Sequence, residues 1–337
     1  MINEEFLLDD AGRRQVVEQL LSKVKDHYLF ADVAEEIVRT LQSDLDGKVY
    51  EAITSGSVFA QVLTEQLRMI GRDRHLFVSY SEQPQPEPAK KERHAVADEE
   101  VEQWRIAESV RQFGFERIER LAGNIGYLDL RGFAEARWAT ETVMWVMNIL
   151  GNTSALILDL RQNRGGWPSM VHLLVSYFFA DEVHLGEYHS REDHEVRQYR
   201  TFPYLAGAKY VNKPVYLLVS RQTFSAAEGF ANHLRAQKRA IIIGETTGGG
   251  IYIGRPFYLT PHFQAWISTG GMRSEPLSAD EEPGIVPDII VPSAEALTRA
   301  HAEALKSVLD ILGEQPYGAL IGLKEEAEAA YQKLADL

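Results

Sequence analysis

Cysteine is absent from all 337 residues, and this absence removes several classes of protein at once. Without cysteine the chain can hold no disulfide framework, no thiolate nucleophile and no cysteine-bound metal. Long apolar runs are missing too, because the longest stretch, Val171–Ala180, is far shorter than the roughly 18 residues of a membrane-spanning helix. The sequence therefore predicts no membrane span, and we expect Val171–Ala180 to form a buried helix.

Basic charge is also in short supply, with 35 Lys and Arg residues against 49 Asp and Glu residues and a net charge of −14. Affinity for nucleic acid comes mainly from clustered Lys and Arg, so this balance argues against a nucleic-acid partner. The first residues, MINEEFLLDDAGRRQ, carry acids where a signal peptide would carry its basic flank. As written, the sequence leads us to expect a cytoplasmic protein, and export stays open if a leader was removed.

What is present is typical of a globular protein with a substantial core, since 45% of the residues are hydrophobic and 25% are charged. Residues 1–81 are expected to form an N-terminal helical bundle, because apolar residues recur there at three- and four-residue steps. The three expected helices span residues 14–28, 32–45 and 57–70. Asp32 and Ser57 are the expected N-caps, and Gly71 is the expected stop.

Residues 82–112 are rich in proline and charge, which indicates a surface connector. From residue 113 to residue 337 short apolar runs alternate with helical patterns, and this alternation predicts an α/β domain. The runs NIGYLDL, ALILDL, PVYLLVS and AIIIGE are the expected strands, buried on both faces. The expected helices span residues 139–150, 168–180 and 225–237, with closing helices over 295–312 and 325–337.

Two turns between a strand and a helix carry residues suited to chemistry. Gly165 and Gly166 lie in the turn before Pro168, where backbone N–H groups can face an oxyanion, although paired glycines also serve tight turns. Ser225 stands at the start of an expected helix, where the free N–H groups stabilise developing negative charge. Ser225 could equally be a helix cap, because Glu228 three residues later completes a capping box.

Other candidates are weaker on their own. His75 follows the end of a helix and could be a general base or an ordinary surface residue, and the acidic turn over residues 280–288 could orient a histidine or simply be solvated. His184, His189 and His194 recur every five residues, a spacing that fits neither a helix face nor a strand face, so no metal site is predicted. The glycine-rich segment 244–250 lacks the Gly-Lys-Ser/Thr of a phosphate loop, and no cofactor is predicted.

Taken in order, these motifs resemble those of the C-terminal-processing and tricorn-type serine peptidases, in the branch similar to interphotoreceptor retinoid-binding protein. The matching segments are DRHL (73–76), GNIGYLDL (123–130), DLRQNRGG (159–166), TFSAAEGFANHL (223–234), GETTGGG (244–250) and EEPGIVPDI (281–289). The resemblance implies a ClpP/crotonase-like α/β catalytic domain preceded by a small N-terminal helical bundle. It also implies that Ser225 is the nucleophile, and that Gly165 or Gly166 forms the oxyanion hole with the Ala226 N–H.

The sequence departs from the C-terminal-processing members in two ways. Their catalytic lysine aligns best with Gly250, so a Ser-Lys dyad is not available there. Only about 50 residues separate His75 from the first strand of the α/β domain, too few for their PDZ domain. The tricorn-type arrangement instead implies His75 as the base and Glu281 as its carboxylate partner, with the neighbouring Glu282 as an open alternative.

The expected function is a serine peptidase that acts on a peptide or protein by acyl transfer. With His75 as the base, the acid limb of the pH profile of kcat/KM would then fall between about pH 6 and 7.5, near the usual histidine pKa of about 6.5. The alternatives are a non-catalytic binding module for an apolar small molecule, such as a retinoid or fatty acid, and a scaffold-like pseudoenzyme. A carrier needs none of the serine, histidine, glutamate and paired glycines that occur together here, which favours the peptidase. The oligomeric state stays open.

Overall fold

The computed structural model describes residues 7–87, 98–191, 196–250, 252–273, 284–314 and 317–335. The chain forms two compact units, each built from three separate segments. The first unit contains Met1–Ala95, Gly186–Tyr199 and Tyr252–Glu281, and the second contains Val96–Leu185, Arg200–Ile251 and Glu282–Leu337. The chain therefore passes from one unit to the other five times.

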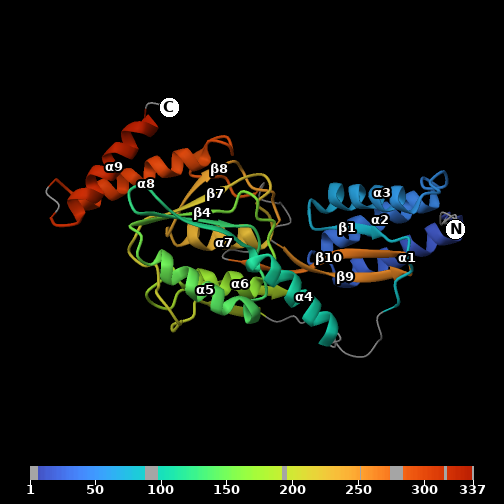
Figure 1. The fold of residues 1–337 in the computed structure, drawn as a ribbon. Coiled ribbons are helices and arrows are strands. Elements are labelled where there is room, and N and C mark those ends of the chain that lie inside the picture. Colours follow the sequence, from blue (N-terminus) through green and yellow to red (C-terminus); the bar gives the residue numbers. More distant parts are fainter. Residues whose placement is uncertain are drawn as a thin grey trace, which may run out of the picture. The chain divides into compact units, whose positions relative to one another are not determined.

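The first unit combines three helices with a sheet (Figure 1). The helices are α1 (Asp10–His27), α2 (Ala31–Asp46) and α3 (Gly56–Gly71), as the apolar periodicity predicts. The sheet has the strand order β1-β10-β5-β6, with β9 paired to β10. Its strands are β1 (Phe77–Tyr80), β5 (His184–Ser190), β6 (Val196–Arg200), β9 (Tyr252–Thr260) and β10 (Phe263–Arg273). The core joins the apolar helix faces to β9 and β10 through Phe257, Phe263 and Ile267, so the helices alone do not make this unit.

The predicted helix caps were partly wrong. Ser55, not Ser57, caps α3, and its side chain accepts the Val58 N–H. Phe30 precedes α2 without a side-chain cap, so Asp32 lies in the first turn of that helix. Both helices begin one residue before the first position of the predicted span, because the first turn of a helix contributes little to its buried stripe.

The second unit is built on a six-stranded sheet in the order β11-β8-β7-β4-β3-β2. Only β2 is antiparallel to its neighbour, and the remaining pairs are parallel. The strands are β2 (Phe115–Leu121), β3 (Ile125–Leu130), β4 (Ala155–Asp159), β7 (Val215–Val219), β8 (Ile241–Gly244) and β11 (Ile289–Ile290). Every residue of β3, β4 and β7 is buried, which confirms the prediction of strands covered on both faces.

Helices cover both faces of this sheet. Figure 1 shows α5 (Ala136–Leu150), α6 (Pro168–Ser176) and α7 (Ala226–Ala236) on one side, and α8 (Ala296–Leu312) with α9 (Leu320–Ala335) on the other. The predicted apolar stretch Val171–Ala180 is largely buried, but its helix ends at Ser176. This is the predicted ClpP/crotonase-like α/β arrangement after an N-terminal helical region, and the described residues contain no PDZ domain.

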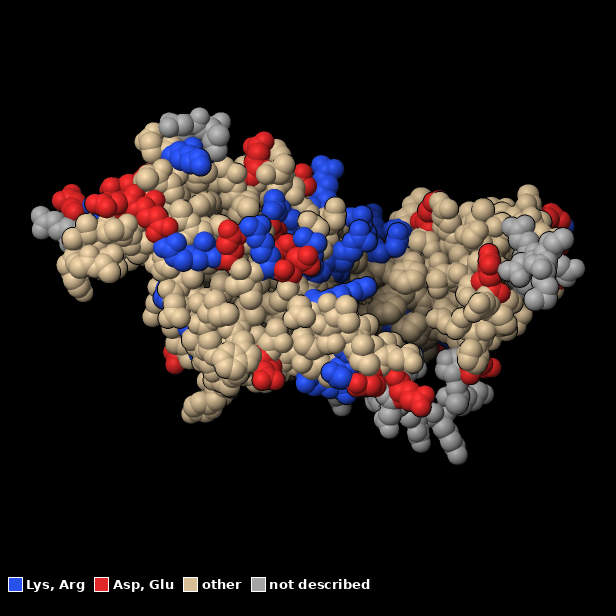
Figure 2. Space-filling model, viewed as in Figure 1, with Lys and Arg blue, Asp and Glu red and all other residues tan. Residues whose placement is uncertain are grey.

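The segment expected to be a connector forms helix α4 (Asp98–Val110) and a short 3-10 turn (Gln112–Gly114). The domain boundaries 1–81, 82–112 and 113–337 stay a prediction. No helix in the described part of the chain has both the length and the apolar content to cross a bilayer. On the face seen in Figure 2, Lys and Arg side chains of the second unit lie among Asp and Glu side chains, and ion pairs such as Arg120–Glu326 and Arg299–Glu303 join opposite charges.

Candidate active site

Ser225 lies at a strained turn between β7 and α7. Its backbone has φ 57° and ψ −124°, a combination that side-chain-bearing residues rarely adopt and that costs on the order of 1–3 kcal/mol. The residue is the N-cap of α7, at the end where the helix dipole is positive. A serine on a strained strand-to-helix turn is the arrangement in which a nucleophilic hydroxyl is presented to substrate.

Glu228 holds this turn in place. Its side chain is completely buried, and Oε2 accepts the Ser225 N–H at 3.0 Å. Oε1 accepts the Thr247 hydroxyl at 2.5 Å and the Gly249 N–H at 2.8 Å. Burial raises the pKa of Glu228, and these hydrogen bonds act in the opposite direction by favouring the charged form. The sequence predicted only the cap on Ser225, because the contacts with residues 247–249 join segments about 20 residues apart.

Of the paired glycines, Gly165 lies against the serine turn and Gly166 lies against Phe133. Gly165 has φ 99°, and a Cβ placed on it would lie 2.8 Å from the Ser225 Cβ and 2.9 Å from the Ala226 N. Gly166 has φ 139°, and its Cβ would lie 2.1 Å from the Phe133 carbonyl oxygen. Any larger residue at either position would displace its neighbours, so the close approach of Gly165 to Ser225 and of Gly166 to Phe133 requires glycine.

The hydrogen bonds of this turn distinguish the Gly165 N–H group from the Gly166 N–H group. The Gly165 N–H donates to the Asn163 Oδ1 at 2.9 Å, inside a buried network in which the Asn163 Nδ2 donates to the Leu130 carbonyl. The Asn163 carbonyl in turn accepts the Phe224 N–H at 3.1 Å. Because the Gly165 N–H already has a partner, the N–H groups of Gly166 and Ala226 are the candidate donors to a substrate oxyanion.

His75 lies in the first unit, in the turn that follows α3. Its side chain is 10% exposed. Burial, with a smaller contribution from the positive charge of Arg68, lowers the pKa of His75 to about 4. The imidazole is therefore neutral at neutral pH, as a general base must be. The sequence predicts an acid limb near the usual histidine pKa, and burial of the ring in the structure shifts the pKa of His75 below that value.

Asp73 accompanies His75 in the same turn. The carboxylate is buried, and its Oδ1 accepts the His75 backbone N–H at 2.8 Å. The same oxygen lies 3.8 Å from the His75 Nδ1. Asp73 was not singled out in the sequence, although it stands within the quoted segment DRHL.

The predicted carboxylate Glu281 and its neighbour Glu282 lie outside the described residues. The chain that follows them is hydrogen-bonded to Thr247. The Ile285 N–H donates to the Thr247 Oγ1 at 2.6 Å, and the Thr247 N–H donates to the Ile285 carbonyl at 3.1 Å. Thr247 thus joins this segment to Glu228 and, through Glu228, to the Ser225 turn.

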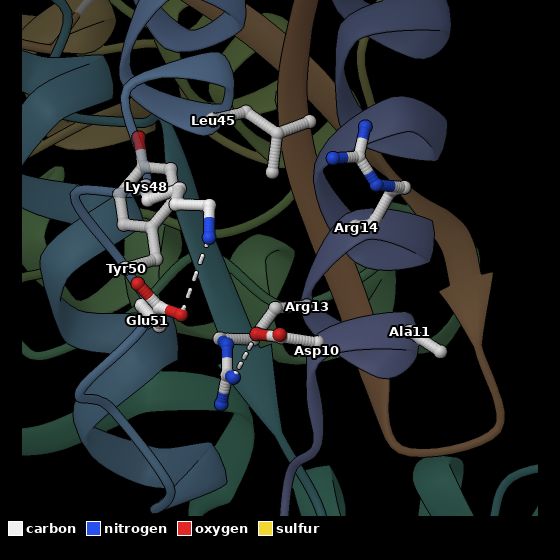
Figure 3. Close-up of a pocket in the computed structure, with 8 residues that line it drawn as sticks. All are labelled: Asp10, Ala11, Arg13, Arg14, Leu45, Lys48, Tyr50 and Glu51. Carbon is white, nitrogen blue, oxygen red and sulfur yellow. Dashed lines mark hydrogen bonds and ion pairs between the residues drawn. The ribbon is translucent and has the colours of Figure 1, made fainter.

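The described residues contain no group of three or more His, Asp or Glu side chains able to hold a metal ion. The first unit has one further feature, a cavity of about 320 Å³ beside the start of α1. It is lined by Asp10, Ala11, Arg13, Arg14, Leu45, Lys48, Tyr50 and Glu51 (Figure 3). Its cations are matched by carboxylates, since Arg13 pairs with Asp10 and Lys48 with Glu51, and no predicted catalytic residue lines it.

Comparison with known proteins defines the class. Residues 124–291, which include Ser225 and the paired glycines, match peptidase family S41. Residues 10–112, which include His75, match the N-terminal domain of peptidase family S41 in eukaryotic IRBP. The chain belongs to peptidase family S41, as its motifs predicted, and this membership supports a serine peptidase.

Solved structures share the fold at low sequence identity. A protein from Parabacteroides merdae, described as a peptidase, aligns over 83% of this chain and 90% of its own with 18% identity and a TM-score of 0.56. A lipoprotein from Streptococcus agalactiae aligns over 88% of this chain and 96% of its own with 15% identity and a TM-score of 0.52. The photosystem II D1 C-terminal processing protease has 22% identity and a TM-score of 0.40, and this chain covers 47% of its length.

Proposed function

We propose that this protein is a serine peptidase that cleaves peptide bonds by acyl transfer through Ser225. His75 is the general base and Glu281 the carboxylate partner, in a tricorn-type arrangement rather than a Ser-Lys dyad. The substrate is a peptide or a protein. The observation that carries the proposal is the strained Ser225 turn packed directly against the backbone of Gly165.

The chemistry follows from these groups. A serine hydroxyl is a weak nucleophile until a positioned base takes its proton, and neutral His75 can do so. The Ser225 Oγ then attacks the scissile carbonyl carbon, and the oxyanion receives hydrogen bonds from the Gly166 and Ala226 N–H groups. The imidazolium returns the proton to the leaving amine, and a water molecule, activated by the same histidine, hydrolyses the acyl-enzyme. Gly250 stands where the lysine of the C-terminal-processing members would be, so histidine has to supply the base.

The alternative, a carrier of an apolar small molecule, has less support from the structure. The cavity described in the first unit is lined mainly by charged side chains, which suit a retinoid or a fatty-acid chain poorly. A carrier also gains nothing from a serine held in a costly backbone conformation.

A fluorophosphonate probe followed by intact-mass measurement tests the proposal. We expect one covalent adduct on the wild-type protein and none on Ser225→Ala. Ser55→Ala is the matched control, because it removes the N-cap of α3 and leaves the candidate site unchanged. Equal labelling of Ser225→Ala, or an unreactive wild-type protein that binds retinol or a fatty acid, would overturn the assignment.

A further inference from the structure

The turn from Arg72 to Leu76 holds a second carboxylate beside the candidate base. Asp73 is 1% exposed, whereas an isolated aspartate rarely leaves water unless hydrogen bonds or charges compensate. One compensation is local, because the Asp73 side chain accepts the His75 N–H and the Asp73 carbonyl accepts the Leu76 N–H at 3.2 Å. These two bonds fix the turn, and they hold the imidazole ring and the carboxylate on the same short segment.

The distance between the ring and the carboxylate matters for catalysis. The Asp73 Oδ1 lies 3.8 Å from the His75 Nδ1, within ion-pair range and just beyond hydrogen-bond length. Catalytic hydrogen bonds are often long without substrate and shorten when substrate binds.

The groups around the pair come from four segments of the first unit. From α3, the Arg68 Nε donates to the Leu76 carbonyl at 2.9 Å and places a positive charge near both side chains. From the end of α1, the Tyr28 hydroxyl donates to the Gly71 carbonyl, and the Arg191 guanidinium binds the Tyr28 carbonyl. Burial raises the pKa of Asp73, while Ser268 from β10, the His75 N–H, Arg68 and Tyr28 act to lower it and so favour the carboxylate.

We infer that Asp73 is a positioning residue that accepts the Nδ1–H of His75 and thereby fixes the tautomer in which Nε2 carries the lone pair, the form that a general base needs. The inference rests on the proposed function, and it gives Asp73 the orienting role that the family resemblance gives to Glu281. When Nε2 takes the serine proton, the Nδ1–H stays donated to Asp73 and the carboxylate stabilises the imidazolium. No proton passes to Asp73 at any step.

Asp73→Asn is the sharpest test, because the amide oxygen still accepts the His75 N–H while the negative charge is lost. We expect kcat to fall by about 10²–10⁴ with little change in KM, because the wrong tautomer of the imidazole becomes favoured. Asp9→Asn is the matched control: Asp9 caps α1 by accepting the Gly12 N–H at 2.8 Å, so the same chemical change is made at a purely structural cap of the same unit. Both variants should keep their melting temperature within a few degrees.

A measurement that needs no activity follows the ring directly. The ¹⁵N chemical shifts of His75, assigned by comparison with His75→Gln, report which ring nitrogen carries the proton. We expect Nδ1–H in the wild type and a shift toward Nε2–H in Asp73→Asn. Wild-type shifts in Asp73→Asn would show that Asp73 does not set the tautomer.

The outcomes also separate this inference from the proposed function. If the wild-type protein does not react with the fluorophosphonate, the peptidase proposal fails, and the ¹⁵N shifts still decide whether Asp73 orients His75. If the wild type reacts and Asp73→Asn reacts at the same rate, the peptidase stands and the role of Asp73 is overturned. A loss of kcat in Glu281→Gln alone would likewise return the orienting role to Glu281.

Discussion

Ser225 keeps a costly backbone conformation because close neighbours leave it no room to relax. The nearest of these is Gly165, whose missing side chain lets two backbone segments meet. Gly165→Ala places a methyl group 2.8 Å from the Ser225 Cβ and also forces alanine to φ 99°. We expect kcat to fall by on the order of 10² or more, since a displacement of about 1 Å at a reacting group costs that much.

Gly229→Ala is the control for this change. It lies four residues beyond Ser225 in α7, and an added Cβ there meets nothing within 4 Å. Because alanine is the better helix former by about 0.8–1 kcal/mol, Gly229→Ala should raise the melting temperature slightly and preserve turnover. Equal activity in the two variants would show that close contact at Gly165 is not needed.

Glu228 offers a second test at the same turn. Glu228→Gln keeps the size of the side chain, but its NH₂ group replaces one of two accepting oxygens. It therefore faces either the Ser225 N–H or the Thr247 hydroxyl and the Gly249 N–H, all of which donate to the wild-type carboxylate. Leaving a buried donor unsatisfied costs about 1–3 kcal/mol of stability. We expect a lower urea midpoint together with a lower kcat. A stability equal to that of the wild type would mean that the carboxylate does not hold the turn.

The pH dependence of kcat/KM tests the burial of His75. The structure lowers the pKa of this group to about 4, so the active, neutral form persists well below the unperturbed value. Activity should therefore be full at neutral pH and should be lost only as the pH falls through about 4. The sequence alone predicted a limb at about pH 6–7.5, the range of an exposed imidazole. An acid limb in that higher range would contradict the buried position of His75.

Stability has a matching dependence on pH. The unfolded chain binds a proton at His75 near the usual pKa of about 6.5, and the folded chain does so only near 4. The contribution of His75 is thus complete above about pH 6.5 and is lost as the pH falls toward 4. His75→Gln removes the ionisable group and should flatten this part of the stability curve.

At the scale of helices and strands, the stability of the sheet in the second unit depends on the helices that pack against it. Leu305 of α8 is completely buried in the cluster that includes Tyr127, Ile157 and Leu218. Leu305→Ala should cost about 2–5 kcal/mol in the free energy of unfolding. Ile311 in the same helix is 65% exposed, so Ile311→Ala should change stability by less than about 0.5 kcal/mol. Urea denaturation of both variants would compare them, and equal midpoints would show that α8 does not pack as described.

Elements with a local signature could be predicted from the sequence. Strands β3, β4, β7 and β8 are continuous apolar runs between turn residues, and α1 to α3 repeat their apolar residues at helical spacing. The sheet of the first unit escaped prediction, because its pairing joins Phe77 to Trp266 and so depends on residues almost 190 positions apart. The cap of α3 was assigned to the wrong serine because Ser55 and Ser57 lie two residues apart and both can cap a helix. In the structure the Ser55 hydroxyl accepts the Val58 N–H.

The sequence indicated candidate site residues but not the contacts around them, and their catalytic roles stay a prediction. Ser225 and the paired glycines stand at strand-to-helix turns that the sequence marks clearly, and the structure places Gly165 against Ser225. The Asn163 side chain accepts the Gly165 N–H, and this bond decides which glycine N–H remains as a candidate donor. The sequence did not identify Asn163 as the partner of Gly165. The Asp73 carboxylate was hidden as well, because an acidic residue near a turn is most often solvated, and Glu228 was indicated only as part of a capping box with Ser225.

At the scale of the whole molecule, the first unit is completed only by a distant part of the chain. The buried faces of α1 to α3 share their core with β9 and β10. A fragment of residues 1–87 lacks these strands, so we expect it to remain without a cooperative thermal transition and to bind a hydrophobic dye such as ANS. A sharp calorimetric transition for this fragment would show that the helices suffice.

Because the chain passes between the units five times, the segments of the first unit leave the ribosome at different times. Helices α1 to α3 emerge first, yet the strand that closes their core ends at Arg273. At roughly 5–20 residues per second, translation takes on the order of ten seconds or more to supply it. During that interval the nascent apolar faces are open to chaperones. A nascent chain stalled before residue 252 should therefore bind a chaperone that releases it once residue 273 has left the exit tunnel.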